Sequence, residues 1–139
     1  MNAYLDSSVV LRVVLGQAGV LAEWQDIRAG VASALVEVEC LRTLDRFRLR
    51  RRIADAEIAA QRAAVYRLLE TVELVEPDRT VLARAFQPMP TELGTLDAIH
   101  LITALLWRER HDADLVMATH DLALGTAARA SGLRVVGLR

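Results

Sequence analysis

The chain has 139 residues and a net charge of −1, with 53% hydrophobic and 25% charged residues, which is enough apolar material for a domain with a buried core. No apolar run approaches the roughly 20 residues of a membrane helix, and the N-terminal MNAYLDSS lacks the basic and apolar parts of a signal peptide. The single cysteine, Cys40, excludes an internal disulfide and a cysteine-based zinc site. We therefore expect one domain over residues 1–139, located in the cytoplasm and not in a membrane.

In chain order, short apolar runs alternate with helical patterns. The expected strands are residues 3–5, 31–34, 72–75, 115–118 and 133–136. The expected helices are residues 9–15, 20–28, 35–47, 54–70, 79–86, 95–107 and 122–130. Short, continuously apolar strands between helices predict a parallel sheet that is covered on both faces. The expected fold class is therefore α/β, with three α/β/α layers and a central parallel sheet.

All 17 basic residues are arginines, and this excludes any mechanism that needs a catalytic lysine. By family analogy, receiver-like phosphotransfer domains and aspartate-nucleophile phosphatases place a lysine beside the phosphoryl group, so neither class fits. The chain also lacks the glycine patterns G-x-x-x-x-G-K and G-x-G-x-x-G that cradle nucleotide phosphates.

Four acidic residues lie where the ends of these elements are expected to meet. Asp6 directly follows the first strand, Asp121 comes three residues after Ala118, and Asp97 opens a strongly apolar helix. Glu39 lies about one turn into the helix after the second strand. Ligands of open parallel sheets bind beyond the carboxyl ends of the strands, and clustered carboxylates repel one another unless a cation intervenes. The pattern indicates a Mg²⁺ or Mn²⁺ site suited to phosphoryl transfer.

Each acid also has a simpler interpretation. The three aspartates all occupy positions where an aspartate caps a helix, so capping alone explains any one of them. Glu39 shares a helix face with Arg42 and Arg46 and is open to an exposed ion pair. Glu37, two positions away, is a rival for the metal site, and the residue pattern does not decide between the two glutamates.

An arginine-rich segment, DRFRLRRR at residues 45–52, is the most basic part of the chain. Arginine binds phosphates in a bidentate manner, so this cluster is suited to RNA. A solvated helix end that interacts with the helix dipole explains it equally well. The arginines of this cluster are Arg46, Arg48, Arg50, Arg51 and Arg52.

The segments YLDSS, SALVEVECLRTL, TLDAIHLITA and ATHDLALGTAARASGLRVV occur in this order between residues 4 and 136. Together they cover about half the chain and resemble the PIN-domain ribonucleases, above all the VapC toxins of bacterial type II toxin–antitoxin modules. The stretch from residue 54 to residue 90 carries no distinctive motif of that family.

The resemblance assigns the four acids residue by residue. The family's first metal-binding aspartate falls on Asp6, and its third acid falls on Asp97 within LDAIH. Its last acid falls on Asp121 within THD, after the hydroxyl residue Thr119. Its helical glutamate lies six positions after the serine of the SAL segment, which is Glu39 and not the neighbouring glutamate.

The resemblance also implies a fold, an activity and partners. It implies a PIN-like domain that acts as a Mg²⁺- or Mn²⁺-dependent endoribonuclease on single-stranded regions of structured RNA such as tRNA or rRNA. A cognate antitoxin protein would inhibit it, and the chain would commonly form a homodimer. The alternative is a non-catalytic PIN-like module that binds RNA or protein, although the presence of all four acids argues against it.

Roles for the site residues follow as expectations. Asp6 and Asp97 hold the metal directly, and Glu39 and Asp121 complete the site through waters. His100 is interpreted as an ordinary residue of an apolar helix, because the three histidines lack metal-ligand spacing. The residues expected to bind substrate or hydrogen-bond within the site are Ser7, Thr119, Arg42 and Arg46.

Overall fold

The computed structural model describes residues 1–138 and contains a five-stranded sheet in which all neighbouring strands are parallel. The strand order is β3-β2-β1-β4-β5. Parallel strands need crossover connections, and helices supply them here. The predicted α/β class with a central parallel sheet is confirmed. The strands are β1 (Asn2–Leu5), β2 (Ala29–Ser33), β3 (Val72–Val75), β4 (Val116–Ala118) and β5 (Arg134–Val136).

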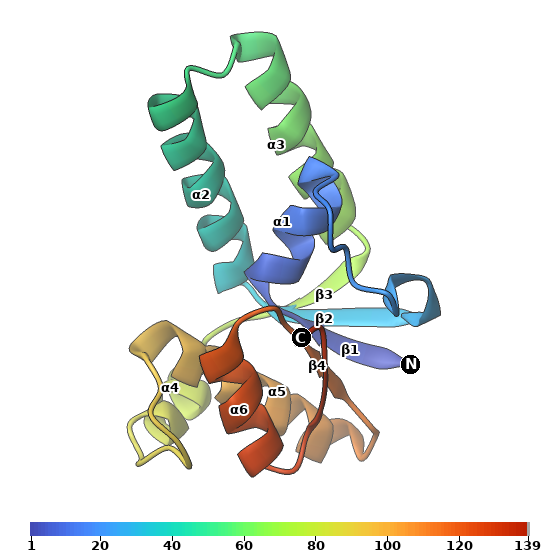
Figure 1. Ribbon diagram of the computed structural model, residues 1–139. Coiled ribbons are helices and arrows are strands. Elements are labelled where there is room, and N and C mark those ends of the chain that lie inside the picture. The colour runs from blue at the N-terminus through green and yellow to red at the C-terminus, as the bar shows by residue number, and fades with distance from the viewer. Residues whose placement is uncertain (139) are drawn as a thin grey trace.

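The helices cover the sheet on both faces, which gives the expected three layers (Figure 1). One face carries α1 (Ser7–Leu15), α2 (Leu35–Arg51) and α3 (Asp55–Leu69). The other carries α4 (Arg79–Ala85), α5 (Thr95–His111) and α6 (Leu122–Ala130). Among residues 1–138, no helix combines the length and the apolar character that crossing a membrane requires.

The central strand β1 contributes to the core on both faces of the sheet. Ala3 and Leu5 pack with the residues of α1, α2 and α3, whereas Tyr4 packs on the side of α5 and α6. This division follows from the alternation of side chains along a strand. Because both faces of β1 are covered, residues 3–5 are all apolar or aromatic. The same arrangement places the Tyr4 hydroxyl inside the core.

The helix α2 is longer than the sequence predicted. It continues through the arginine-rich segment to Arg51, its last residue. The next residue, Arg52, is the C-cap and has a left-handed backbone with φ 51°. Arginine is a good helix former, and no glycine or proline interrupts this run. Figure 1 shows the outer parts of α2 and α3 reaching away from the sheet beyond α1. The arginine cluster is therefore carried on a helical projection.

The predicted helix over residues 20–28 is wrong. This segment contains only the short 3₁₀ helix η1 (Trp24–Asp26). Leu21, Trp24 and Ile27 contact the core beside α1, α2 and α3. Their spacing of three matches a 3₁₀ turn, which has three residues per turn, better than a long α-helix.

The strand order reverses its direction of growth between β1 and β4. The chain builds the sheet outward from β1 through β2 to β3, and β4 then returns to the other side of β1. Such a reversal is where open α/β sheets bind ligands. The Asp6 amide donates to the Ala118 carbonyl oxygen at 3.0 Å, which joins the ends of the two strands.

Candidate active site

Asp6 lies at the carboxyl end of β1, beside the end of β4, and is held by two hydroxyl groups. Its Oδ2 accepts hydrogen bonds from Ser8 Oγ at 2.6 Å and from Thr119 Oγ1 at 2.8 Å. The residue occupies the N-cap position of α1, but its side chain makes no capping hydrogen bond, so the capping interpretation is wrong here. Within residues 1–138 its other oxygen, Oδ1, accepts no hydrogen bond, although Asp6 is buried with only 5% of its surface exposed. That oxygen is available for a ligand.

Thr119 holds Asp6 and is not accessible to a substrate. Its side chain is fully buried, and its Oγ1 donates to Asp6 while it accepts the Asp121 amide at 3.0 Å. Thr119 hydrogen-bonds within the site as the sequence predicts, whereas its burial contradicts a contact with the substrate. The threonine instead ties the end of β4 to two of the four acids.

The serine in this network is Ser8, whereas the sequence suggested Ser7. Ser8 Oγ donates to Asp6 and accepts the His120 amide at 3.0 Å. Among the described residues, Ser7 makes no side-chain hydrogen bond, and it forms the first residue of α1. Successive helical residues point about 100° apart, so only one of two adjacent serines can face the same carboxylate.

Asp97 lies in the first turn of α5, where burial and the negative charges of the other acids raise its pKa. The N-cap of this helix is Gly94, so the capping interpretation is wrong for Asp97 as well. Burial, followed by the carboxylates of Asp121, Asp6 and Glu39, raises the pKa of Asp97 to about 6, against an opposing effect of His100. Carboxylates affect one another in this way only when they lie close together.

Asp121 is the one aspartate of the three that caps a helix. Its Oδ1 accepts the Leu124 amide at 2.9 Å at the start of α6. Asp121 is exposed, yet it is the carboxylate that raises the pKa of Asp97 most. Capping and membership of the acidic site are therefore compatible for this residue.

A buried histidine links Glu39 to the sheet. His100 is fully buried on α5, and its Nε2 contacts Glu39 Oε1. Its Nδ1 lies 2.6 Å from the hydroxyl of Tyr4, which accepts the Ser33 amide at 3.0 Å. Burial lowers the pKa of His100, but the hydrogen bond to Glu39 and the surrounding carboxylates outweigh it and raise the pKa. Sequence reasoning missed this role, although the spacing of three between Asp97 and His100 puts both on one helix face.

The arginines beside Glu39 do not pair with it. Arg42 lies 3.5 Å from Asp45, and Arg46 donates to Thr43 Oγ1 at 3.1 Å. The described part of the chain contains no ion pair between Glu39 and an arginine, so the ion-pair interpretation of Glu39 is wrong. Both arginines are exposed on α2.

The donor set fits a hard divalent cation. Within residues 1–138, no three acidic, histidine or cysteine side chains are placed to hold an ion together. Mg²⁺ nevertheless takes only one or two direct carboxylates and keeps several waters, and Asp6 Oδ1 is free. Four neighbouring carboxylates with one free buried oxygen match such a water-rich site better than an all-protein cage.

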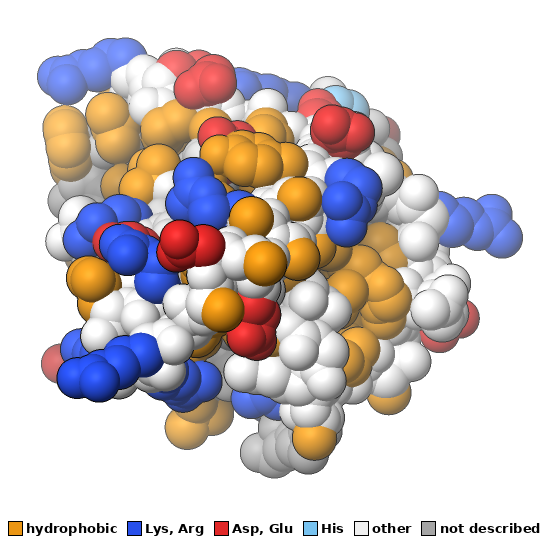
Figure 2. Space-filling model, turned by 90° about the horizontal axis from the view of Figure 1, so that it is seen from above, with side chains coloured by type: hydrophobic (Ala, Val, Ile, Leu, Met, Phe, Trp, Pro, Cys, Tyr) orange, Lys and Arg blue, Asp and Glu red, His pale blue; other side chains and the backbone are white. Residues whose placement is uncertain are grey.

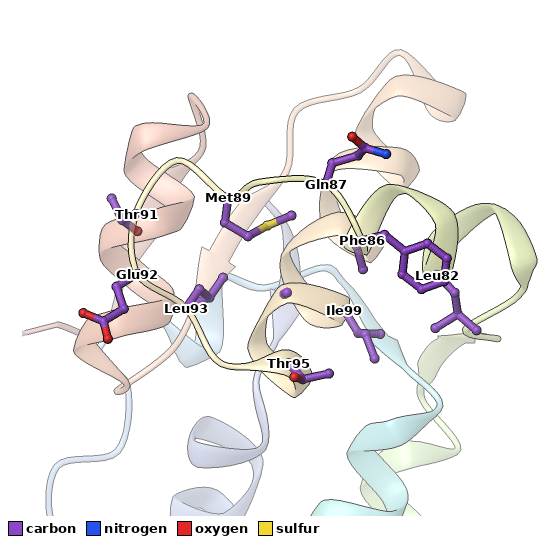
Figure 3. Close-up of a pocket in the computed structure, with 11 residues that line it drawn as sticks. Leu82, Phe86, Gln87, Met89, Thr91, Glu92, Leu93, Thr95 and Ile99 are labelled. Atoms are coloured by element: carbon purple, nitrogen blue, oxygen red, sulfur yellow. The ribbon is translucent and has the colours of Figure 1, made fainter.

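An apolar cavity of about 470 Å³ lies beside the acidic site, between α4 and the first turns of α5 (Figure 3). Met89, Leu93 and Ile99 line it, and Glu92 is its one acidic lining residue. The cavity lacks the clustered carboxylates that a metal needs. It is therefore separate from the candidate active site.

Comparison with known proteins agrees with this geometry. The family model described as PIN domain matches residues 3–129. The chain is 33% identical over 137 residues to Ribonuclease VapC46 of Mycobacterium tuberculosis, an alignment that covers 96% of this chain and 95% of the relative. The acids at the ends of β1 and β4 and in α2 and α5 lie within these matched ranges. The chain belongs to the PIN-domain family, among the VapC ribonucleases.

Proposed function

We propose that this protein is a Mg²⁺- or Mn²⁺-dependent endoribonuclease and the toxin of a type II toxin–antitoxin module. Its substrates are single-stranded regions of structured RNA such as tRNA or rRNA. The relative named Ribonuclease VapC46 supports the activity. The non-catalytic alternative has no support, because all four acids are present and grouped.

The observation that carries the proposal is the grouping of the acids around the buried Asp6, whose Oδ1 accepts no hydrogen bond from the described residues. Burial together with the three other acids of the site also raises the pKa of Asp97 to about 6. A fold that served only to bind protein or RNA has no need for such repulsion, whereas a nuclease uses the concentrated negative charge to bind a cation.

The surroundings of each of the four acids indicate its role in the metal site. A bound Mg²⁺ or Mn²⁺ supplies activation of water and stabilisation of charge on the phosphoryl group. Asp6 and Asp97 would hold the ion directly, because Asp6 has a free oxygen and Asp97 is a half-buried carboxylate that the neighbouring carboxylates repel. Glu39 and Asp121 would complete the site through waters and would orient the attacking water.

The RNA approaches along α2. Glu39, Arg42 and Arg46 are separated by three and four residues and so follow one face of the helix, with Glu39 and Arg46 about 10 Å apart along its axis. Figure 2 looks down on the end of the molecule that carries α2 and α3, and most blue side chains gather on the side where α2 lies. We assign phosphate contacts to these two arginines and a substrate contact to Ser7 near the acidic site.

The partners follow from the family. We propose that a cognate antitoxin inhibits the nuclease by covering the acidic site, that the chain forms a homodimer, and that it acts in the cytoplasm. Residues 1–139 form one PIN-like domain in this proposal.

An Asp6→Asn variant tests the function. The amide oxygen can replace Oδ2 as the acceptor for both hydroxyls, which leaves an NH₂ group where the free oxygen stood. Loss of several kcal/mol of transition-state stabilisation predicts a fall of about 100-fold or more in cleavage of a fluorescent single-stranded RNA and of total tRNA. Chelator should stop the wild type, and added Mn²⁺ should restore it.

Asp114→Asn is the matched control, because Asp114 is exposed and, within residues 1–138, its side chain makes no hydrogen bond; its backbone oxygen accepts one from Asn2 Nδ2 at 3.3 Å. It should cleave like the wild type. Undiminished cleavage by Asp6→Asn, or cleavage insensitive to chelator, would show that the proposed function is wrong.

A further inference from the structure

We propose that Tyr4 and His100 are positioning residues that fix the Glu39 carboxylate in the acidic site and thereby set its affinity for the metal. This inference rests on the proposed function, since it takes Glu39 as part of the metal site. It assigns a role to two buried polar side chains that the mechanism above does not use.

The three side chains form one hydrogen-bonded chain across four elements. Ser33 at the end of β2 donates its amide to the Tyr4 hydroxyl at 3.0 Å, and this hydroxyl lies 2.6 Å from His100 Nδ1. His100 Nε2 then contacts Glu39 Oε1 on α2. The chain therefore begins at a backbone amide of the sheet, which is rigid, and ends at a carboxylate of the acidic site.

In this hydrogen-bonded chain, each donor can be paired with an acceptor. While the His100 ring is neutral, Tyr4 accepts the Ser33 amide and donates its own proton to His100 Nδ1, which leaves Nε2–H to donate to Glu39. When the ring is protonated, Nε2–H still donates to Glu39. A tyrosine at this position thus selects the ring tautomer that can hold a carboxylate. Outer partners of metal sites commonly act by fixing a tautomer and orienting the ligand.

Packing alone does not require these residues. Tyr4 and His100 are both fully buried, and a buried polar group is costly unless every partner is present. A leucine in place of His100 would fill an apolar helix face without that requirement. The feature that a leucine lacks is the hydrogen bond to Glu39.

Glu39 has a long side chain that would otherwise be free. It is 22% exposed and pairs with no arginine among the described residues. A free glutamate loses side-chain entropy when it is fixed, and its long side chain makes this loss one of the larger ones among the amino acids. Holding it beforehand lowers the cost of metal binding. His100 is fully buried and cannot touch RNA, so its role is to position Glu39 and not to take part in the reaction.

Two amide variants separate positioning from packing. His100→Gln places its amide nitrogen near the position of Nε2 and keeps a donor for Glu39. His100→Asn is one carbon shorter, so it reaches toward Tyr4 but not Glu39. Mn²⁺ binding, measured by electron paramagnetic resonance on the metal-free folded proteins, should weaken about tenfold in His100→Asn. His100→Gln should recover affinity to within about threefold of the wild type.

A double-mutant cycle ties the effect to the carboxylate. If His100 acts through Glu39, then His100→Asn should not weaken Mn²⁺ binding further in a Glu39→Gln background. Tyr4→Phe gives a second route, because it removes the hydroxyl that orients the ring while it keeps the ring volume. It should weaken Mn²⁺ binding in the same direction, and thermal unfolding without metal reports its structural effect separately.

Each outcome decides one of the two proposals. Equal Mn²⁺ affinity of the His100→Gln and His100→Asn proteins, or additive effects in the cycle, would overturn the positioning role and leave the ribonuclease proposal intact. A difference in Mn²⁺ affinity without any RNA cleavage by the wild type would uphold the positioning role and overturn the ribonuclease. A wild-type protein that binds no Mn²⁺ would overturn both.

Discussion

Raising the pH of the metal-free protein from about 5 to about 7.5 should destabilise it through Asp97. The pKa of Asp97 is about 6 in the folded protein, compared with an ordinary value of 3.8 in the unfolded chain. A carboxyl group with a raised pKa stabilises the fold while it is protonated, and this contribution is lost as the pH rises through the folded value. At neutral pH, the charged Asp97 therefore opposes folding until a cation neutralises it.

The size of the effect follows from the two pKa values. Over this pH range, linkage gives a loss of about 1.4 kcal/mol, and because Asp97 is only half-buried, solvent screening reduces this to about 1 kcal/mol. For a domain of this size, 1 kcal/mol lowers the Tm by roughly 3 to 5 °C. The pKa of His100 is also raised, so His100 changes stability in the same direction. The comparison must therefore be made with a variant at Asp97.

The assay is thermal unfolding of the wild type and of Asp97→Asn, both without metal, across this pH range. The asparagine stays uncharged, so the Tm of the wild type relative to the variant should fall by those few degrees as the pH rises. Adding Mn²⁺ at pH 7.5 should raise the Tm of the wild type more than that of the variant. Parallel pH profiles for the two proteins would refute the assignment of a destabilising charge to Asp97.

Two further results are expected. Glu39→Gln should abolish RNA cleavage and Glu37→Gln should leave it nearly unchanged, because Glu39 contacts His100 and acts on Asp97; equal cleavage rates of the two variants would contradict the choice of glutamate. Arg42→Ala and Arg46→Ala should each weaken RNA binding and lower the salt dependence of the dissociation constant by about one phosphate contact, measured by fluorescence anisotropy. An exposed arginine at the start of β5, replaced as Arg134→Ala, is the control, and an equal loss there would indicate a nonspecific charge effect.

The strand ends were predictable because local sequence determines them. Asp6 and Asp121 were placed at one edge of the sheet from the short apolar runs that precede them, and the structure has them at the ends of neighbouring strands. The helix expected over residues 20–28 is replaced by a short 3₁₀ helix, because Leu21, Trp24 and Ile27 repeat every three residues. The helix expected over residues 35–47 continues to Arg51, because arginine favours a helix and no glycine or proline interrupts the segment.

The contacts around Glu39 were not predictable from the pattern. Its partner His100 lies 61 positions away, and Tyr4 lies 96 positions from that histidine. Such pairs are created by the strand order and by the crossing of α5 over the sheet, which residue spacing does not encode. A histidine in an apolar helix is also typical of a core residue, and His100 is indeed fully buried. Only the partners at its two nitrogens reveal that it reaches the acidic site.

The four acids differ in what stabilises their negative charge, and this difference locates the cation. Asp6 accepts two hydroxyl groups, Asp121 accepts a helix amide, and Glu39 is bound by His100. Asp97 accepts no hydrogen bond from the described residues, and burial together with the other carboxylates raises its pKa to about 6. Hydrogen bonds to a carboxylate favour its charged form, and Asp97 has no such bond to offset the repulsion from the neighbouring carboxylates. A cation therefore gains most where Asp97 faces the other three, because there it removes a cost that no donor of the protein offsets.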